Sequence, residues 1–255
     1  MTLNAHAGVD ARGAYDLPRL AHAIAAAHPD IVGIQELTRN HSEYQCDDQP
    51  ALLATLLQQI TGRTWTHVYE KEWVTTHRQC MDSGRGDGVE TEGLTLLAPE
   101  RLTSVDHVQL WNGRIGLSAH LASVPQVAFV VTHLASGVQG QTDRVRQLET
   151  LLPWVESRGR STVFIGDFNA IPDAPELQPV LARFHDAWTD ADARHATSGP
   201  AATHSRWRID YVFYTPGQRL DLERVEVLET SSIFGIAGPE VSDHRPVVAT
   251  FRVHS

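Results

Sequence analysis

The sequence predicts a mixed α/β fold within one domain. Apolar runs of strand length recur along the chain, and longer stretches between them repeat apolar residues at helical spacing. The chain has 255 residues, of which 42% are hydrophobic, and this is enough to bury one large core. Because no Pro- or Ser-rich linker, low-complexity segment or internal repeat interrupts it, we expect a single domain over residues 1–255.

Helices are predicted from amphipathic stretches and their end signals. Asp16 is a suitable N-cap for a helix with Leu17, Leu20 and Ile24 on one face, and the proline-containing segment 28–30 stops that helix. Three further helices are expected at 52–60, 139–156 and 175–184.

Strands are predicted from the short apolar runs. They are expected at 1–6, 31–36, 65–69, 94–97, 105–110, 114–122, 126–133, 163–165, 210–214, 223–229 and 247–253. The polar segments 38–50, 74–91 and 185–208 are expected to be irregular loops, and such loops often carry substrate contacts.

The apolar run 163–165 ends at Gly166 in a polar turn that carries Asp167 and Asn169. A carboxylate and a carboxamide two residues apart can face one small volume at the mouth of a sheet. Both offer hard oxygen ligands, which suit Mg²⁺ or Mn²⁺ beside a phosphate. Taken alone, Asp-x-Asn is also an ordinary turn, so the interpretation depends on the rest of the chain.

Other strand edges carry polar residues in the same way: Asn4, Glu36, His133, Asp210 and the Asp243-His244 pair. In this order, the set resembles the endonuclease/exonuclease/phosphatase superfamily, the deoxyribonuclease I-like and exonuclease III-like metal-dependent phosphoesterases. The resemblance runs from Asn4 to the Ser-Asp-His-Arg-Pro segment at 242–246. It implies a four-layered α/β sandwich, with two packed, mostly antiparallel β-sheets flanked by helices.

The resemblance implies a Mg²⁺ or Mn²⁺ cofactor. Glu36 is expected to hold the ion with help from Asp243 and Asn4, and Asn4 is also expected to contact the phosphate. Asp167 and Asn169 are expected to position water, the phosphate or a second ion. The number of ions is left open.

The resemblance also implies catalytic roles for two histidines. His133 is expected to act in acid catalysis or to stabilise the transition state. His244 is expected either to take a proton from water or to bind a phosphoryl oxygen, and Asp210 and Asp243 each to orient a histidine or bind metal. Which group is the general base is left open.

Two further site residues are expected from the family pattern. Glu92 is expected to pair with His133 and orient it, with Glu90 as the alternative because the preceding loop is long. Arg114 is expected to contact the phosphate, since a guanidinium can grip two phosphate oxygens at once.

Cys46 and Cys80 are the two cysteines of the chain, and both lie in predicted polar loops. This placement favours a disulfide, and therefore an exported (secreted or periplasmic) protein whose signal peptide would have been removed, over two reduced thiols in the cytoplasm. The Asp-rich turn at 82–88 is a further candidate, for structural Ca²⁺, although its ligand set is incomplete.

The net charge of −10 argues against a protein that wraps nucleic acid through a broad basic surface, but it allows a local or metal-bridged phosphate contact. We expect hydrolysis of DNA or RNA phosphodiester bonds, with an endonuclease as the leading hypothesis and nucleic acid as the substrate. The alternative is a lipid or small-molecule phosphoesterase, sphingomyelinase-like or inositol-phosphate phosphatase-like. The intact ligand set disfavours a non-catalytic binding domain. We expect a monomer without a stable protein partner or transmembrane segment.

Overall fold

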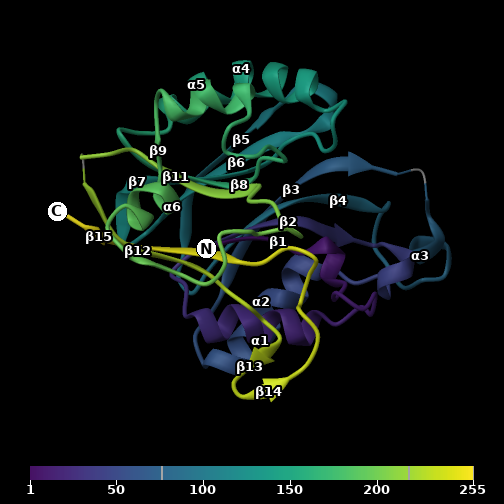
Figure 1. The fold of residues 1–255 in the computed structure, drawn as a ribbon. Helices are drawn as coiled ribbons and strands as arrows, with labels where there is room; N and C mark the ends of the chain where they lie inside the picture. The colour runs from purple at the N-terminus through teal and green to yellow at the C-terminus, as the bar shows by residue number, and fades with distance from the viewer. Residues whose placement is uncertain (76, 218, 255) are drawn as a thin grey trace.

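Two β-sheets pack face to face, and helices cover the outer face of each sheet (Figure 1). The computed structural model describes residues 1–75, 77–217 and 219–254. Helices α1 (Leu17–Ala27) and α2 (Gln49–Thr61) lie outside the first sheet, and α4 (Gln141–Ser157) and α5 (Gln178–Leu181) lie outside the second. The expected four-layered α/β sandwich is therefore confirmed.

The first sheet has the strand order β10-β12-β15-β1-β2-β4-β3, and the second has the order β5-β6-β7-β8-β11-β9. The first consists of β1 (Thr2–Asn4), β2 (Val32–Arg39), β3 (Thr66–Val74), β4 (Thr91–Ala98), β10 (Thr197–Ser198), β12 (Leu220–Val227) and β15 (Val247–Val253). The second consists of β5 (Leu102–Gln109), β6 (Ile115–Leu121), β7 (Val124–His133), β8 (Ser161–Asp167), β9 (His185–Asp186) and β11 (Asp210–Tyr214). The smaller elements are η1 (His6–Gly8), η2 (Ser42–Tyr44), η3 (Trp111–Gly113), η4 (Pro175–Leu177), α3 (Gln79–Asp82), α6 (Ala187–Asp192) and the hairpin β13 (Ser232–Ile233) and β14 (Ile236–Ala237).

Each sheet is organised around a parallel pair of strands joined by a helix. In the first sheet β1 and β2 are parallel, and in the second β7 and β8 are parallel, while β15 and β11 run antiparallel beside them. The carboxyl ends of the four parallel strands and the amino ends of β11 and β15 therefore meet at one edge of the sandwich. This edge collects the polar strand-end residues of the sequence.

Three apolar clusters hold the layers together. One lies between the sheets and includes Leu96 and Ile165, while the other two join each sheet to its helices. The first helix begins after Asp16, whose side chain accepts a hydrogen bond from the Arg19 amide at 2.9 Å, and α2 ends at Gly62 in the left-handed conformation. The Asp16 cap was predicted.

The sequence prediction fails mainly at the loops. Strand β3 continues to Val74, although it was expected to end at residue 69, because it pairs with β4 along its whole length. The segment 185–208 is not irregular, since it contains β9, α6 and β10. Asp186 is the N-cap residue of helix α6, and its side chain also accepts two hydrogen bonds from Arg208. That ion pair joins residues 22 positions apart, so the local pattern does not reveal it.

Among the residues that the structure describes, no helix is both long enough and apolar enough to cross a membrane.

Gly166 allows strand β8 to approach β7 closely just before Asp167. Its φ is +147°, and a Cβ at this position would overlap the carbonyl oxygen of Thr132. A side chain here would push β8 away from β7, and with it the carboxylate that follows.

We expect Gly166→Ala to lower the free energy of unfolding by about 3–5 kcal/mol, because it combines an unfavourable φ with a backbone clash. Gly13→Ala is the matched control, since Gly13 has a φ of +85° but open space around it, and it should cost about 1 kcal/mol. Urea unfolding of both variants measures the difference, and equal losses would contradict this account of Gly166.

Candidate active site

The predicted site residues converge at the edge where the parallel strands end. His133, Asp167 and Asp210 are direct neighbours across β7, β8 and β11. In the other sheet Asn4 lies opposite Gln35, one residue before Glu36. The two sheets therefore bring residues from distant parts of the chain to a common volume.

A bulge in β2 presents Glu36 to this volume. The register of β2 against β4 shifts between Ile34 and Leu37, and Glu36 adopts a φ of +59°. Such bulges redirect a side chain at the end of a strand. The Glu36 side chain is buried on most of its surface but keeps 26% exposure, so it remains accessible from solvent.

Asn4 joins two carboxylates across the sheets. Its Nδ2 donates to Glu36 Oε1 at 2.9 Å and to Asp167 Oδ2 at 3.2 Å, and its Oδ1 accepts from the His6 amide at 3.0 Å. In this orientation the amide nitrogen of Asn4 faces the site. Its oxygen accepts from the backbone, so Asn4 acts here as a hydrogen-bond donor to the two carboxylates, and its expected role as a metal ligand stays a prediction.

His244 is held by Asp210, as one of the two expected roles of that aspartate requires. Nδ1 of His244 lies 2.9 Å from Asp210 Oδ2, while Nε2 lies 3.8 Å from Asp167 Oδ2. Burial lowers the pKa of His244, but the carboxylates of Asp210 and Asp167 outweigh it and raise the pKa to about 10. His244 therefore carries a proton at neutral pH in the metal-free site.

His133 also points at Asp167, and it lies close to Glu36 as well. Its Nε2 lies 3.6 Å from Asp167 Oδ2 and 3.7 Å from Glu36 Oε1. Burial, reinforced by the positive charge of Arg114, lowers the pKa of His133 well below its usual value. This histidine is therefore neutral at neutral pH, in contrast to His244.

The expected Glu92–His133 pair is not formed. Oε1 of Glu92 accepts a hydrogen bond from Trp73 Nε1 at 2.8 Å. The carboxylate nearest to His133 Nδ1 is Glu72, at 3.9 Å, and the group bonded to Nδ1 is Arg114, at 2.7 Å. Sequence reasoning missed Glu72 because it lies in the extension of β3, and no local feature separates it from Glu70.

Arg114 does not project toward solvent as a phosphate-binding residue would. Its side chain is buried, Nη1 donates to Glu72 Oε2 at 3.2 Å, and the guanidinium lies 4.5 Å from the centre of the Trp73 ring. This arginine is turned inward against His133, and the expected phosphate contact stays a prediction.

Asp167 lies between the two imidazoles. Burial, with the neighbouring Asp210 carboxylate as the next cause, raises the pKa of Asp167 to about 7. Oδ1 accepts a hydrogen bond from the Asn169 amide at 2.8 Å, and Asn169 has a φ of +50°. The Asn169 side chain donates to the Leu134 carbonyl at 3.1 Å. The predicted Asp-x-Asn turn is therefore part of the site.

Asp243 lies at the rim, where its carboxylate is 45% exposed. It is 3.6 Å from His6 Nδ1 and 3.6 Å from His204 Nε2, and the His204 ring packs on His244 with 4.5 Å between ring centres. His6 and His204 were not predicted as site residues. A histidine two residues after Asn4 was the one available signal.

The donor set fits a hard divalent cation. Among the described residues, carboxyl oxygens of Asp167 and Asp210 lie within 4.8 Å of each other beside His244, and Asp243 and His204 have possible ligand atoms at the same spacing. Oδ1 of Asp210 is buried and has no hydrogen-bond partner. Mutually repelling carboxylates with an unpaired oxygen are what a Mg²⁺ or Mn²⁺ ion would compensate.

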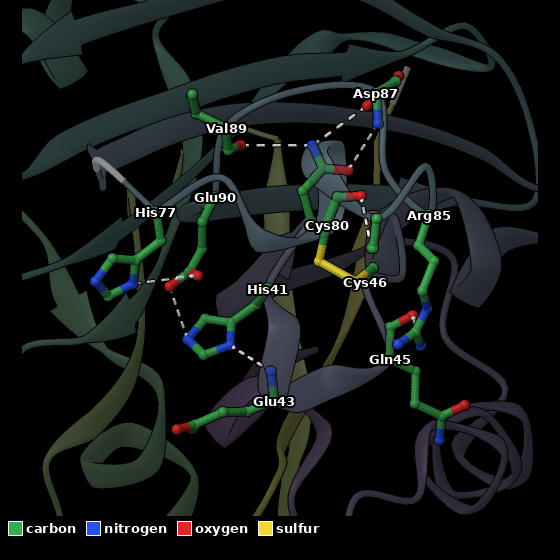
Figure 2. Close-up of a disulfide and its surroundings, with 12 residues drawn as sticks. His41, Glu43, Gln45, Cys46, His77, Cys80, Arg85, Asp87, Val89 and Glu90 are labelled. Carbon is green, nitrogen blue, oxygen red and sulfur yellow. Dashed lines mark hydrogen bonds and ion pairs between the residues drawn. A yellow bond between two sulfur atoms is a disulfide. The ribbon is translucent and has the colours of Figure 1, made fainter.

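The Cys46–Cys80 disulfide is present and joins the two loops beside β2 and β4 (Figure 2). Near it, His41 and His77 both point toward Glu90, at 2.9 Å and 3.6 Å. Glu90 is thus occupied away from His133, which removes it as the alternative partner. Neither group of possible metal ligands found in the described residues contains an aspartate of the turn at 82–88, so the expectation of Ca²⁺ there gains no support.

A pocket of about 420 Å³ adjoins Arg114 and is lined by residues that include Trp73, Asn112 and Gln139. A larger cavity of about 780 Å³ lies at the opposite edge of the sandwich, near Met1 and Phe251, and its lining includes none of the site residues described above. The polar and ionisable side chains described above therefore lie at the strand-end edge and not in the larger cavity.

The chain belongs to the Endonuclease/Exonuclease/phosphatase family, whose model matches residues 1–244. It is similar in structure to an endonuclease/exonuclease/phosphatase from Beutenbergia cavernae, at 24% identity and a TM-score of 0.73 over 99% of this chain and 70% of that one. The human Nocturnin catalytic domain with bound sulfate matches at 20% identity and a TM-score of 0.70, over 99% and 92% of the two chains. TDP2 from D. rerio, complexed with single strand DNA product, matches at 18% identity and a TM-score of 0.68, over 99% and 97%. Comparison with curated proteins finds no match.

The raised pKa of Asp167 predicts that its charge destabilises the metal-free protein. Because the folded-state pKa of about 7 lies above the usual 3.8, this cost develops as the pH rises from about 4 to about 7. We expect Asp167→Asn to raise the free energy of unfolding in EDTA at pH 8 by on the order of 2 kcal/mol, and to have little effect at pH 4.

Asp173→Asn is the matched control, since Asp173 is an exposed aspartate in the adjoining turn. Chemical unfolding at the two pH values measures both variants. Mg²⁺ should stabilise the wild-type protein more than Asp167→Asn, and a loss of stability in Asp167→Asn at pH 8 would contradict this reading of the site.

Proposed function

We propose that the protein is a divalent-metal-dependent phosphodiesterase that hydrolyses nucleic acid. The observation that carries the proposal is the convergence of two imidazoles on one carboxylate, with His133 Nε2 and His244 Nε2 lying 3.6 Å and 3.8 Å from Asp167 Oδ2. Two N–H donors beside a potential base form a suitable site for phosphoryl transfer.

Glu36 and Asp243 would hold the Mg²⁺ or Mn²⁺ ion, and Asp167 with Asn169 would border it. When bound, the ion supplies neutralisation of phosphate charge and lowers the pKa of a water molecule. The partial exposure of the Glu36 and Asp243 side chains leaves both carboxylates within reach of a substrate from solvent.

The protein residues then divide the proton transfers. Asp167 accepts a proton from the attacking water, since a pKa of about 7 suits a general base near neutral pH. As the bond from phosphorus to the leaving oxygen breaks, protonated His244 gives its Nε2 proton to that oxygen, and Asp210 stabilises the imidazolium. His133 is neutral, so it donates a hydrogen bond to a phosphoryl oxygen. The acid is thus assigned to His244 and the role of transition-state stabiliser to His133.

Exposed tryptophans support nucleic acid as the substrate. Trp111 is exposed, and the Arg146 guanidinium lies 4.7 Å from the centre of its ring. Trp207 is also exposed, pairs with His204 in a β-bridge, and has the Arg206 guanidinium 4.7 Å from its ring centre. Exposed aromatic rings with adjacent cations can stack on unpaired bases. One structural neighbour, TDP2 from D. rerio, was solved with single strand DNA product. The disulfide supports export to an oxidising compartment.

A second candidate is lipid phosphoester hydrolysis, which is favoured by the β13–β14 hairpin. This hairpin exposes the apolar side chains of Phe234 and Ile236. No local feature of the sequence indicated a membrane-binding hairpin here. Apolar residues on a protruding hairpin can enter the surface of a membrane.

The test of nucleic-acid hydrolysis is cleavage of supercoiled plasmid and of single-stranded DNA and RNA, with Mg²⁺ or Mn²⁺ and with EDTA. We expect metal-dependent cleavage that Glu36→Gln and His244→Ala each reduce by about 10²–10⁴-fold, because each variant removes a ligand or a proton donor. Glu223→Gln and His254→Ala remove exposed partners of surface ion pairs and serve as controls.

Nicking of the plasmid would establish endonuclease action. If the folded protein binds metal but cleaves no nucleic acid, and instead hydrolyses a phosphodiester lipid in vesicles in a manner weakened by Phe234→Ser, the second candidate replaces the first. Full activity of Glu36→Gln would overturn the proposed site.

A further inference from the structure

The two imidazoles of the site are held at Nδ1 by groups of opposite chemistry. His244 is held by the carboxylate of Asp210, and an ionised carboxylate accepts hydrogen bonds but donates none. His133 is held by the guanidinium of Arg114, whose Nη1 lies 2.7 Å from His133 Nδ1. A guanidinium has no acceptor, so Nδ1 of His133 must carry a lone pair.

This contact determines the tautomer of His133. With a lone pair on Nδ1, the neutral ring carries its hydrogen on Nε2. Nε2 is the nitrogen that faces the site, since it lies 3.7 Å from Glu36 Oε1 and 3.6 Å from Asp167 Oδ2. A carboxylate at Nδ1 would favour the opposite tautomer, in which Nε2 would be an acceptor.

Buried side chains hold Arg114 in place. Nη1 donates to Glu72 Oε2 at 3.2 Å, and the Glu72 side chain is fully buried. Burial raises the pKa of Glu72 to about 8, against the lowering effect of the Arg114 charge. Trp73 covers the guanidinium at 4.5 Å from its ring centre, and Glu92 fixes the indole through its 2.8 Å hydrogen bond. Glu92, the expected partner of His133, therefore acts on this histidine only through Trp73 and Arg114.

The neighbouring backbone depends on the same packing. Gly113 has a φ of +80°, and a Cβ there would lie 2.8 Å from the Trp73 ring. A glycine before Arg114 thus allows the indole to lie over the guanidinium. Three chain segments, residues 72–73, 92 and 113–114, are joined into one support beneath His133.

We propose that Arg114 is a positioning residue, oriented by Glu72 and Trp73, that fixes His133 as an Nε2–H donor to the substrate. The identity of that acceptor, a phosphoryl oxygen, rests on the proposed function. The tautomer itself does not, because it follows from the contact with Arg114.

The direct test is ¹⁵N NMR of the metal-free protein with labelled histidine, with the His133 signals assigned by their loss in His133→Gln. We expect the Nε2–H tautomer of His133 in the wild-type protein at pH 7.0, marked by a protonated Nε2 and an unprotonated Nδ1. An Nδ1–H tautomer or an imidazolium in the wild-type protein would overturn the proposal. This result requires neither a substrate nor a variant of Arg114.

The second test is Arg114→Met, which keeps an apolar stem and removes the donor. The Glu72 carboxyl, with Oε2 at 3.9 Å from His133 Nδ1, is then the nearest group, so we expect the Nδ1–H tautomer to replace Nε2–H above the pKa of Glu72, where that carboxyl is ionised and accepts. Arg158→Met is the control, since Arg158 also lies over a tryptophan, 4.8 Å from the Trp154 ring, and pairs with Asp106 far from the site. An unchanged tautomer in folded Arg114→Met would contradict the role of Arg114.

Kinetics with a phosphodiester substrate complete the test. We expect Arg114→Met to lower kcat by about 10²-fold with KM changed by less than about threefold, because the lost donor acts on the transition state. Equal loss through KM would indicate substrate binding by Arg114 and would overturn the positioning role. If the wild-type protein shows the Nε2–H tautomer but hydrolyses no phosphodiester, the proposed function fails and the positioning role of Arg114 stands.

Discussion

Repulsion between buried carboxylates is the constraint on which the rest of the site depends. The strand-end edge brings Glu36, Asp167 and Asp210 together, and burial with the neighbouring Asp210 carboxylate raises the pKa of Asp167 to about 7. The structure offsets this cost with donors from β1 and from the segment before β15: the Asn4 amide between two carboxylates and the Nδ1–H of His244 on the third. These donors do not compensate all the carboxylate oxygens, since Asp210 Oδ1 has no hydrogen-bond partner in the described part of the chain. A cation would supply the missing positive charge.

The topology explains why these groups meet. Each sheet supplies a parallel pair joined by a helix, β1–β2 and β7–β8, and the carboxyl ends of parallel strands lie at a common edge. An antiparallel strand beside each pair, β15 or β11, begins at that same edge. The site therefore lies on rigid strand ends, and the hydrogen-bonded register, not a flexible loop, fixes the relative positions of His133, Asp167 and Asp210.

The two histidines show how one residue type acquires two functions. Asp210 keeps His244 protonated, whereas burial and Arg114 keep His133 neutral. The two rings thus have opposite protonation states, with a cation at Nδ1 of His133 and an anion at Nδ1 of His244. The Nε2 atoms of both rings face Asp167. The difference lies in the burial of His133 and in the residue behind each ring, which explains why residues outside the reacting volume matter for the chemistry.

The sequence by itself determined the mixed α/β content and the polar strand-end residues, because apolar runs and turn residues are local properties. The four-layered class followed from the family resemblance of the motifs in their order along the chain. The tertiary structure alone decided which side chains touch. Glu72 reaches Arg114 across 42 positions, and Asn4 reaches Asp167 across 163. The error of placing Glu92 beside His133 has this cause: the pairing of β4 with β3 sets Glu92 opposite Trp73, and this register cannot be read from spacing along the chain.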